Sequence, residues 1–344
     1  MNAVKGQNIL LVMLLLLGTF ATVQLVREPV NSPRFLRAKD SRNLWNNTLK
    51  LKAKPLPKTA VASPLTQLPD GTDLRSLTVR GKKLKLERGE GHAFTSSDRA
   101  RYHALKAIGQ RQKNARIQWA LMNLDNEEII HKSRQPALNF YGASVSKIYI
   151  GAGILHKQKG KLSKGQLQEL ADMVVVSSNR AWGSLQRQTG NGSERKGQEY
   201  IQQFTKKLGH KNAIAFRGWM DRLHGNEVSA RDMVQLLADT YKQRFEGAET
   251  LWKVMHATRT GKTKGLKYLP KSMNVGGKTG TYRGYTVHPQ TQKPYRANVH
   301  HHAMIFKHDG TQYGLVVMTD QSTNEEVALL TAGVVQESLG ILKQ

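Results

Sequence analysis

The stretch from Ser144 to Leu155 reads SVSKIYIGAGIL, and the prediction of the fold starts from it. After Lys147 the stretch contains no charged residue, which predicts a helix that is buried on most sides. Upstream, residues 117–124 alternate as a strand does, Asp125 and Asn126 form a turn, and residues 128–130 return. The segment therefore predicts a β-hairpin, a loop and a buried helix that begins at Ser144.

Helices are also predicted on both sides of this segment. Residues 96–111 suit a basic helix, and residues 162–176 and 180–188 have helical spacing of apolar residues. Ser229 and Asp232 resemble a capping box that opens another helix. Strands return at Val275, at 299–306 and at 313–318, with Asp309-Gly310 as a hairpin turn, before a last helix over 324–342. This order predicts an α/β chain of the α+β type: an antiparallel sheet flanked by helices, with an all-helical domain inserted at about 145–255.

The N-terminal part has a different character. Lys5 precedes an apolar run from Ile9 that continues to Val26, about 18 residues, which is enough to span a bilayer. Residues 1–26 therefore predict either a cleaved signal peptide or a retained membrane anchor. Residues 27–94 are rich in proline, lysine and arginine and predict a disordered basic tether. The folded domain is expected over residues 95–344.

The charge of the chain is strongly positive, since 53 Lys and Arg face 25 Asp and Glu, a formal net charge of +28. Such a chain is attracted to polyanions, namely nucleic acid, anionic lipid or an anionic envelope polymer, although a generally basic proteome or an acidic habitat would give the same composition. The chain has no cysteine. This excludes disulfides, thiolate zinc sites, cysteine nucleophiles and a lipoprotein anchor.

Three short motifs occur in order along the chain. Ser144-Val-Ser-Lys147 fits S-x-x-K, Ser177-Ser-Asn179 fits S-x-N, and Lys278-Thr-Gly280 fits K-T-G. Each pattern is weak alone. Their order carries the argument, because the first opens a buried helix, the second lies between two helices and the third lies on a strand.

The residue types suit nucleophilic catalysis by serine. A serine hydroxyl needs a base beside it, and residues three apart on a helix share a face, so Lys147 can place its amine against Ser144. A lysine is a base only when neutral, and burial beside a second cation, here Lys278, lowers its pKa. Ser177 can then relay a proton to a leaving nitrogen.

The remaining motif residues suit substrate binding. Asn179 can hold a substrate amide, Lys278 and Thr279 can receive a carboxylate, and Gly280 allows close approach of the strand backbone. The three motifs together resemble those of the penicillin-binding protein and class A serine β-lactamase superfamily. The resemblance covers residues 95–344 and no part of the tether.

This resemblance implies an exported serine acyl hydrolase that forms an acyl-enzyme on Ser144. Its substrates would be β-lactams or D-Ala-D-Ala peptides of peptidoglycan, and it would need no cofactor and no metal. The backbone N–H groups of Ser144 and Thr281 would form the oxyanion hole. The protein would act in the periplasm or at the outer face of the cytoplasmic membrane, where its N-terminal segment would contact the membrane.

The sequence departs from class A enzymes in two ways. The distance from Ser144 to Ser177 is shorter, and the glutamate that activates the deacylating water has no counterpart in its usual setting. Asp221 is a candidate substitute, or else a surface partner of a neighbouring arginine, whereas Glu227 is expected to support a helix start. Without such a base the acyl-enzyme would persist, which favours a D,D-peptidase or penicillin-binding protein. A β-lactamase with an atypical base and a non-hydrolytic binding module remain alternatives.

Other signals carry less weight. His300, His301 and His302 resemble a metal tract, but neighbouring residues of a strand point to opposite faces and cannot all bind one ion. Nucleic-acid binding through the tether would require a cytoplasmic protein, against which the apolar N-terminus argues. Three aromatic residues could either line the substrate cleft or pack in the protein core: Trp219, Tyr282 and Tyr285.

Overall fold

The computed structural model describes residues 64–111, 116–210, 213–214 and 225–342. Its centre is a five-stranded antiparallel sheet with the strand order β4-β3-β9-β8-β7. The edge strand β7 is also the strand that carries the K-T-G motif. The bounds are β3 (Ile117–Asn123), β4 (Glu128–Lys132), β7 (Val275–Val287), β8 (Pro294–His308) and β9 (Thr311–Thr319).

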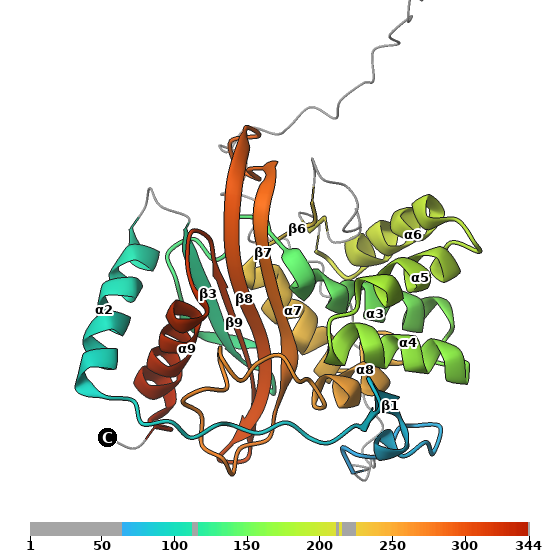
Figure 1. Cartoon of the computed structure of the whole chain (residues 1–344), viewed down its shortest axis with the longest axis horizontal. Helices are drawn as coiled ribbons and strands as arrows, with labels where there is room; N and C mark the ends of the chain where they lie inside the picture. Colours follow the sequence, from blue (N-terminus) through green and yellow to red (C-terminus); the bar gives the residue numbers. More distant parts are fainter. Residues whose placement is uncertain (1–63, 112–115, 211–212, 215–224, 343–344) are drawn as a thin grey trace, which may run out of the picture. The chain divides into compact units, whose positions relative to one another are not determined.

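Helices cover both faces of this sheet (Figure 1). α2 (Ser96–Gln110) and α9 (Asn324–Leu339) pack on one face, and α7 (Ala230–Tyr241) and α8 (Ala248–Met255) pack on the other. Strand β3 divides its side chains accordingly: Trp119 belongs to the core beside α9, while Ala120 belongs to the core beside α7. Because both faces are covered, the strand reads as a nearly continuous apolar run.

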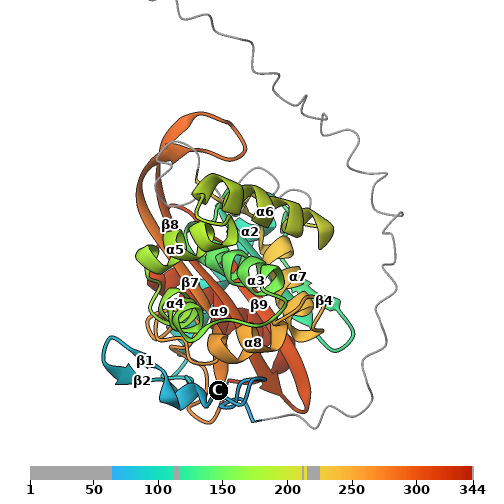
Figure 2. The ribbon, with the colours of Figure 1, turned by 90° about the vertical axis from the view of Figure 1, so that its right-hand side faces the viewer.

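The remaining helices form a group in front of the sheet in Figure 2. They are α3 (Lys147–Lys157), α4 (Lys164–Val175), α5 (Asn179–Thr189) and α6 (Glu194–Lys207). α3 lies within the group and is buried from Lys147 to Leu155, which is why its sequence lacks a polar face. A short turn of 3₁₀-helix, η3 (Ala143–Ser146), precedes α3, and the two-stranded pair β5 (Phe140–Tyr141) and β6 (Glu227–Val228) lies beside it.

Residues 64–94 form an N-terminal strap that runs along the folded domain (Figure 1). The strap contains η2 (Leu74–Ser76), β1 (Thr78–Val79) and β2 (Lys82–Lys83). Its Leu77 and Leu84 are buried in the core of the helical group, and Glu87 exchanges backbone hydrogen bonds with His256 and Val275. The structure thus differs from the expectation of a disordered tether over 64–94, because apolar residues spaced between the lysines bury enough surface to order the chain. Residues 27–63 lie outside the described residues.

The predicted fold class, an antiparallel sheet flanked by helices, is confirmed. The Asp309-Gly310 turn has φ of 45° and 80°, as a two-residue hairpin requires, and Ser229 caps α7. The predicted helix start is wrong: Ser144 lies in η3, and α3 begins at Lys147. Within the described ranges no helix is long and apolar enough to cross a membrane, and the apolar run from Ile9 lies outside those ranges.

Candidate active site

Ser144 lies in a tight turn that hydrogen bonds hold in place. The Gly142 N–H donates to the Asn226 carbonyl at 2.6 Å, and the Ser146 hydroxyl donates to the Ala143 carbonyl at 2.7 Å. Ser146 in turn accepts from the Asn226 side chain at 2.9 Å. Ala143 has a φ of 44°, in the left-handed region that costs a non-glycine residue about 1 kcal/mol or more. The turn is therefore constrained, and Ser144 is left half-buried at its surface.

Lys147 is fully buried at the start of α3, and its amine has three polar partners. Nζ donates to the Ser177 carbonyl at 2.7 Å, to the Ser177 hydroxyl at 3.2 Å and to Asn179 Oδ1 at 2.7 Å. Burial lowers the pKa of Lys147 to about 7. The Ser144 hydroxyl, which the sequence pairs with Lys147, has no hydrogen bond to it, so the amine is directed at the S-x-N motif instead.

Ser177 lies in the turn between α4 and α5 with a φ of 63°. Its neighbour Ser178 caps α5 by accepting from the Ala181 N–H, and this fixes the turn. The Ser177 hydroxyl oxygen accepts hydrogen bonds from Lys147 Nζ and, at 2.9 Å, from Lys278 Nζ. One hydroxyl oxygen thus bridges two lysines, an arrangement through which a proton can pass.

Strand β7 brings the K-T-G residues to this hydroxyl. Lys278 is fully buried, and its Nζ also donates to the Thr279 carbonyl at 2.7 Å. Burial first, and then the charges of Lys147 and Lys264, hold the pKa of Lys278 well below its usual range. The Thr279 hydroxyl donates to the Thr260 hydroxyl at 2.6 Å.

Gly280 lets β7 pass close to the serine turn. A Cβ at this position would lie 3.2 Å from the Ser144 backbone nitrogen and 3.1 Å from that of Val145. A side chain at this position would therefore crowd the serine turn, whereas the sequence suggested that the glycine allows approach to substrate. Thr281, the next residue, is exposed.

Lys264 is a further buried lysine beside the site, and sequence reasoning missed it. Its Nζ donates to the Gly280 carbonyl at 2.8 Å and to the Thr281 hydroxyl at 2.7 Å, and only 3% of the residue is exposed. Burial lowers its pKa to about 7. Nothing in the sequence distinguishes Lys264 from its neighbours Lys262 and Lys267, because no motif or apolar pattern surrounds it.

The electrostatics of the site follow from these three lysines. Within the described ranges, no carboxylate pairs with Lys147, Lys264 or Lys278. Burial favours the neutral amine over the ammonium ion in all three, and the charges of Lys147 and Lys264 add to this effect at Lys278. At neutral pH the site therefore holds lysine nitrogen that can accept a proton, which a base requires.

The histidine tract lies on β8 opposite the K-T-G motif. His300 contacts the Asn324 side chain, His301 Nε2 contacts the Tyr141 carbonyl at 2.8 Å, and His302 Nδ1 accepts from the Gly265 N–H. The three rings thus have three separate partners. Among the described residues no group of histidine and carboxylate side chains is arranged to hold a metal ion. His301 instead ties β5, just before the serine turn, to the sheet.

Several candidates do not join this site or lie outside the described residues. Asp221, the candidate deacylation base, and Trp219 lie in 215–224, outside the described residues. Glu227 is buried in β6, where it pairs with Tyr141 of β5. Tyr282 packs against Tyr141 with ring centroids 4.5 Å apart and ring planes tilted by 31°, and Tyr285 is 73% exposed.

Comparison with known proteins identifies the family. The model of the β-lactamase enzyme family matches residues 151–337, which is more than half of the chain. The chain therefore belongs to the β-lactamase enzyme family and is a serine hydrolase of the β-lactamase type. The match begins after Ser144 and Lys147, so the place of these two residues in the site comes from the structure. No curated protein matches the sequence.

Solved structures share the fold at low sequence identity. A β-lactamase from Chitinophaga pinensis is 17% identical with a TM-score of 0.53, over 69% of this chain and 96% of its own. One from Sphaerobacter thermophilus is 14% identical with a TM-score of 0.53, over 72% and 99%. One from Streptosporangium roseum is 16% identical with a TM-score of 0.53, over 72% and 100%. At these identities the likeness establishes the fold alone.

Proposed function

We propose that the protein forms an acyl-enzyme on Ser144 with β-lactams or with D-Ala-D-Ala peptides of peptidoglycan. The observation that carries the proposal is the bridge from Lys147 through the Ser177 hydroxyl to Lys278, next to the turn that holds Ser144. Two lysines of lowered pKa on one serine hydroxyl give a route for a proton in a site without a carboxylate partner among the described residues.

In the first step the Ser144 oxygen attacks the carbonyl carbon of the substrate, and its proton passes to neutral lysine. Lys147 lies three residues after Ser144 at the junction of a 3₁₀-turn and a helix, where positions three apart share a side, so its amine can receive that proton after a small rotation. The negative oxygen of the intermediate would be held by the N–H groups of Ser144 and Thr281. The contact between β7 and the serine turn supports this pairing.

In the second step the bond to the leaving nitrogen breaks. The Ser177 hydroxyl gives its proton to that nitrogen and regains one from the protonated Lys147. Asn179 would hold a substrate amide, and Thr279 with Lys278 would receive the substrate carboxylate. Lys264, which donates to the Thr281 hydroxyl, would fix that residue at the same end of the strand.

We favour a long-lived acyl-enzyme, as in a D,D-peptidase or penicillin-binding protein. The support is the sequence, in which the glutamate that activates the deacylating water in class A enzymes has no counterpart in its usual setting. The alternative is a β-lactamase in which Asp221 supplies that base. A non-hydrolytic binding module is the third reading.

Mass spectrometry of the purified full chain mixed with a penicillin tests the proposal. A stable mass increase on the peptide that contains Ser144 supports a penicillin-binding protein, and a transient one with accumulating hydrolysed drug supports a β-lactamase. The Ser144→Ala variant is expected to lose the label, while Ser97→Ala, at an exposed position of α2, is expected to keep it. Absence of any penicillin adduct in the folded wild-type protein, together with no release of D-alanine from a D-Ala-D-Ala peptide, would overturn the proposal.

We also propose that the catalytic domain works outside the cytoplasm, held or delivered by residues 1–26, with residues 27–63 as a linker. The apolar run after Lys5 supports export, and peptidoglycan lies outside the membrane. Cell fractionation tests this. Recovery of the native protein in the cytosol would contradict it, and the mass of the recovered chain would show whether the N-terminal segment is cleaved.

A further inference from the structure

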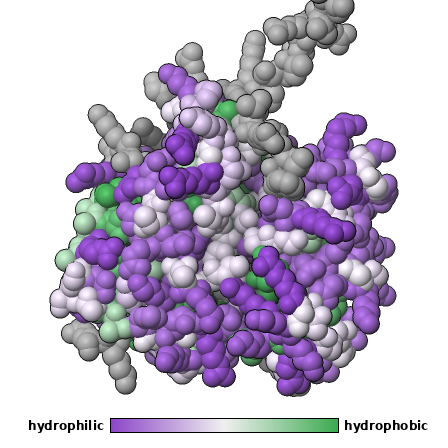
Figure 3. Space-filling model, in the orientation of Figure 1, coloured by the Kyte–Doolittle hydropathy of each residue, from purple (hydrophilic) through white to green (hydrophobic). Residues whose placement is uncertain are grey.

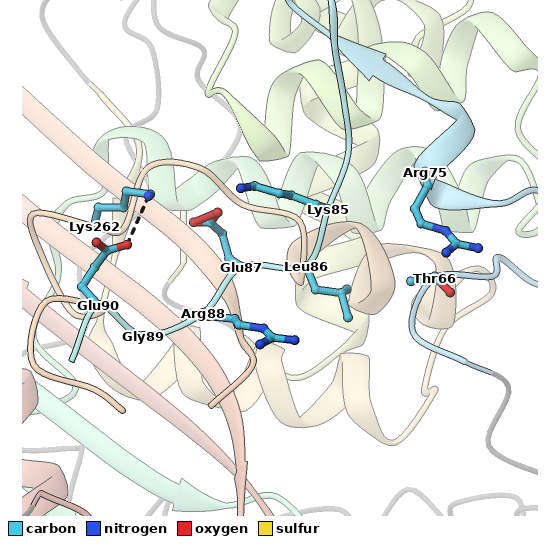
Figure 4. A pocket seen from close by; sticks show the side chains of 9 residues that line it. All are labelled: Thr66, Arg75, Lys85, Leu86, Glu87, Arg88, Gly89, Glu90 and Lys262. Carbon is cyan, nitrogen blue, oxygen red and sulfur yellow. Dashed lines mark ion pairs between the residues drawn. The ribbon is translucent and has the colours of Figure 1, made fainter. Parts of the chain in front are cut away.

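Two open cavities lie side by side between the N-terminal strap and the loop that follows α8. One, of about 430 Å³, is lined by strap residues and Lys262, and Figure 4 shows it extending from the Lys262–Glu90 ion pair to Arg75. The other, of about 370 Å³, has Lys82, Lys83 and Arg259 in its lining, which the first cavity lacks. They share three lining residues and so form one cationic groove: Lys85, Glu87 and Lys262.

The sequence of the strap explains why its cations face outward. Leu84 is buried while Lys83 and Lys85 on either side are exposed, the alternation expected of an extended chain with one face on the core. Arg259 fixes the opposite wall, because its guanidinium donates to the Val79 and Lys83 carbonyls of the strap. The groove is thus a built feature of the fold and not a gap between independent parts.

Most of the positive charge in the groove is not neutralised by neighbours. Arg75 pairs with Asp73 at 2.8 Å and Lys262 pairs with Glu90 at 3.2 Å. By contrast, four exposed cations have no carboxylate partner among the described residues: Lys82, Lys83, Lys85 and Arg88. These four, on one short stretch of strap, attract anions strongly.

The lining also limits the kind of anion. None of the described lining residues is aromatic, so the groove lacks the platforms on which nucleic-acid bases stack. Leu86 is its one large apolar residue, which is too little surface for insertion into a lipid bilayer. The surrounding face is largely hydrophilic (Figure 3). A row of cations along an open groove suits a linear chain of charges better than one small anion.

One lining group has the opposite sign. Glu87 is 4% exposed, and one of its carboxylate oxygens has no hydrogen-bond partner among the described residues. In Figure 4 it points to the same side of the strap as Lys85. Burial raises the pKa of Glu87 above its usual value, and a negative charge at this position opposes the binding of an anion in the groove.

We propose that this cationic groove binds a linear polyanion that bears phosphate groups and no bases. The groove is distinct from the acyl-transfer site. Its ligand would hold the enzyme at a phosphate-rich polymer while the Ser144 site works on its own substrate. Arginine and lysine are suited to this, since both pair with phosphate oxygens and the cost of desolvation at an open groove is small.

Fluorescence anisotropy with labelled linear polyphosphate tests the proposal on the full chain. The variant Lys82→Gln/Lys83→Gln/Lys85→Gln/Arg88→Gln is expected to weaken binding roughly tenfold or more and to lower the dependence of affinity on salt. The matched control Lys161→Gln/Lys196→Gln/Lys206→Gln/Lys207→Gln loses the same charge at exposed positions elsewhere and is expected to change affinity much less. Equal losses of affinity in both variants would show that only net charge matters and would overturn the proposal of a binding groove.

Two further variants and three competitors sharpen the result. A variant with arginine in place of the three lysines and lysine in place of Arg88 should retain binding. Glu87→Gln should tighten binding several-fold, because it removes the one buried negative charge of the groove. Inorganic phosphate should compete far more weakly than polyphosphate of equal phosphate content. Stronger binding to vesicles of anionic lipid, or to single-stranded DNA, than to polyphosphate would contradict the proposal. Penicillin labelling of Ser144 should be unchanged in all variants, which separates this outcome from that of the proposed function.

Discussion

Lys278 and Ser177 lie 101 residues apart in the chain, and the Lys278 amine donates to the Ser177 hydroxyl at 2.9 Å. The same oxygen accepts a hydrogen bond from the Lys147 amine, so the two motif lysines are linked through one serine hydroxyl and not by direct contact. Because each lysine raises the cost of charging the other, the bridge couples their protonation. The site can therefore hold a neutral amine at neutral pH and still pass a proton along the hydroxyl.

Ser177→Ala removes the bridge. We expect acylation by penicillin to slow at least 100-fold, because the leaving nitrogen loses its proton donor. The two buried amines lose an acceptor, so the free energy of unfolding should fall by about 1–3 kcal/mol. Stopped-flow labelling and urea unfolding measure the two effects. Labelling at the wild-type rate would show that Ser177 does not relay the proton.

The acylation rate should rise with pH through about 7, the value to which burial lowers the pKa of Lys147. Below this pH the amine is protonated and cannot accept the Ser144 proton. The second-order rate of labelling between pH 5.5 and 9 tests this, with circular dichroism as a control for folding. A rate independent of pH across that interval would exclude lysine as the base.

Stability should depend on pH in the same direction. The pKa values of Lys147 and Lys264 are about 7 in the folded protein, below the ordinary value of 10.5. Between these pH values the unfolded chain binds more protons, so the free energy of unfolding should increase with pH, by up to ~1.4 kcal/mol per pH unit for each lysine. Urea unfolding from pH 7 to 9.5 measures the slope. A flat or falling profile would mean that these lysines remain charged when buried.

Lys264→Met separates stability from activity. Methionine fills similar volume without a buried amine, so we expect equal or greater stability, especially below pH 7. The rate of acylation by a substrate with a free carboxylate should fall several-fold, because the Thr281 hydroxyl and the Gly280 carbonyl lose their hydrogen-bond partner. The ratio of labelling rates for a penicillin and its methyl ester reports the loss. An unchanged ratio would assign Lys264 a structural role alone.

Gly280→Ala should push β7 away from the serine turn. The new Cβ would lie 3.1–3.2 Å from two backbone nitrogens, which cannot move as a flexible side chain can. We expect labelling of Ser144 to slow by roughly 10- to 100-fold and stability to fall by about 1–3 kcal/mol. Gly165→Ala, in the first turn of α4 and with open space around it, is the control and should be neutral. Unchanged labelling in Gly280→Ala would show that the contact is not needed.

Much of the fold could be predicted from local patterns. The Asp125 hairpin, the buried α3 and the cap at Ser229 follow from periodicity and turn chemistry, which act over a few residues. α6 and α8 were not predicted, and β8 begins at Pro294, earlier than the apolar pattern of 299–306 suggests. The extra length pairs with β7 alone, and of its side chains only Ala297 and Tyr295 join a small apolar cluster, which is too few to give a clear strand pattern.

The candidate site was predictable in its composition and not in its geometry. The order of the three motifs named Ser144, Lys147, Ser177 and Lys278, since this chemistry needs those residue types. The sequence could not show that Lys147 is directed at Ser177 and Asn179, because the helix starts after Ser144 and turns the amine toward another element. Nor could it show Lys264, which differs from other lysines only in being buried.

The sequence by itself determined which chemistry the chain can carry, the kinds of element it forms and the excess of positive charge. Only the tertiary structure decided that three lysines without a carboxylate partner in the described ranges are buried together, and that part of a lysine-rich N-terminal segment is a folded strap lining a groove. The physical reason is the same for both. Burial and neighbouring charge set the pKa and the partners of a lysine, and these depend on residues brought together by folding from distant parts of the chain.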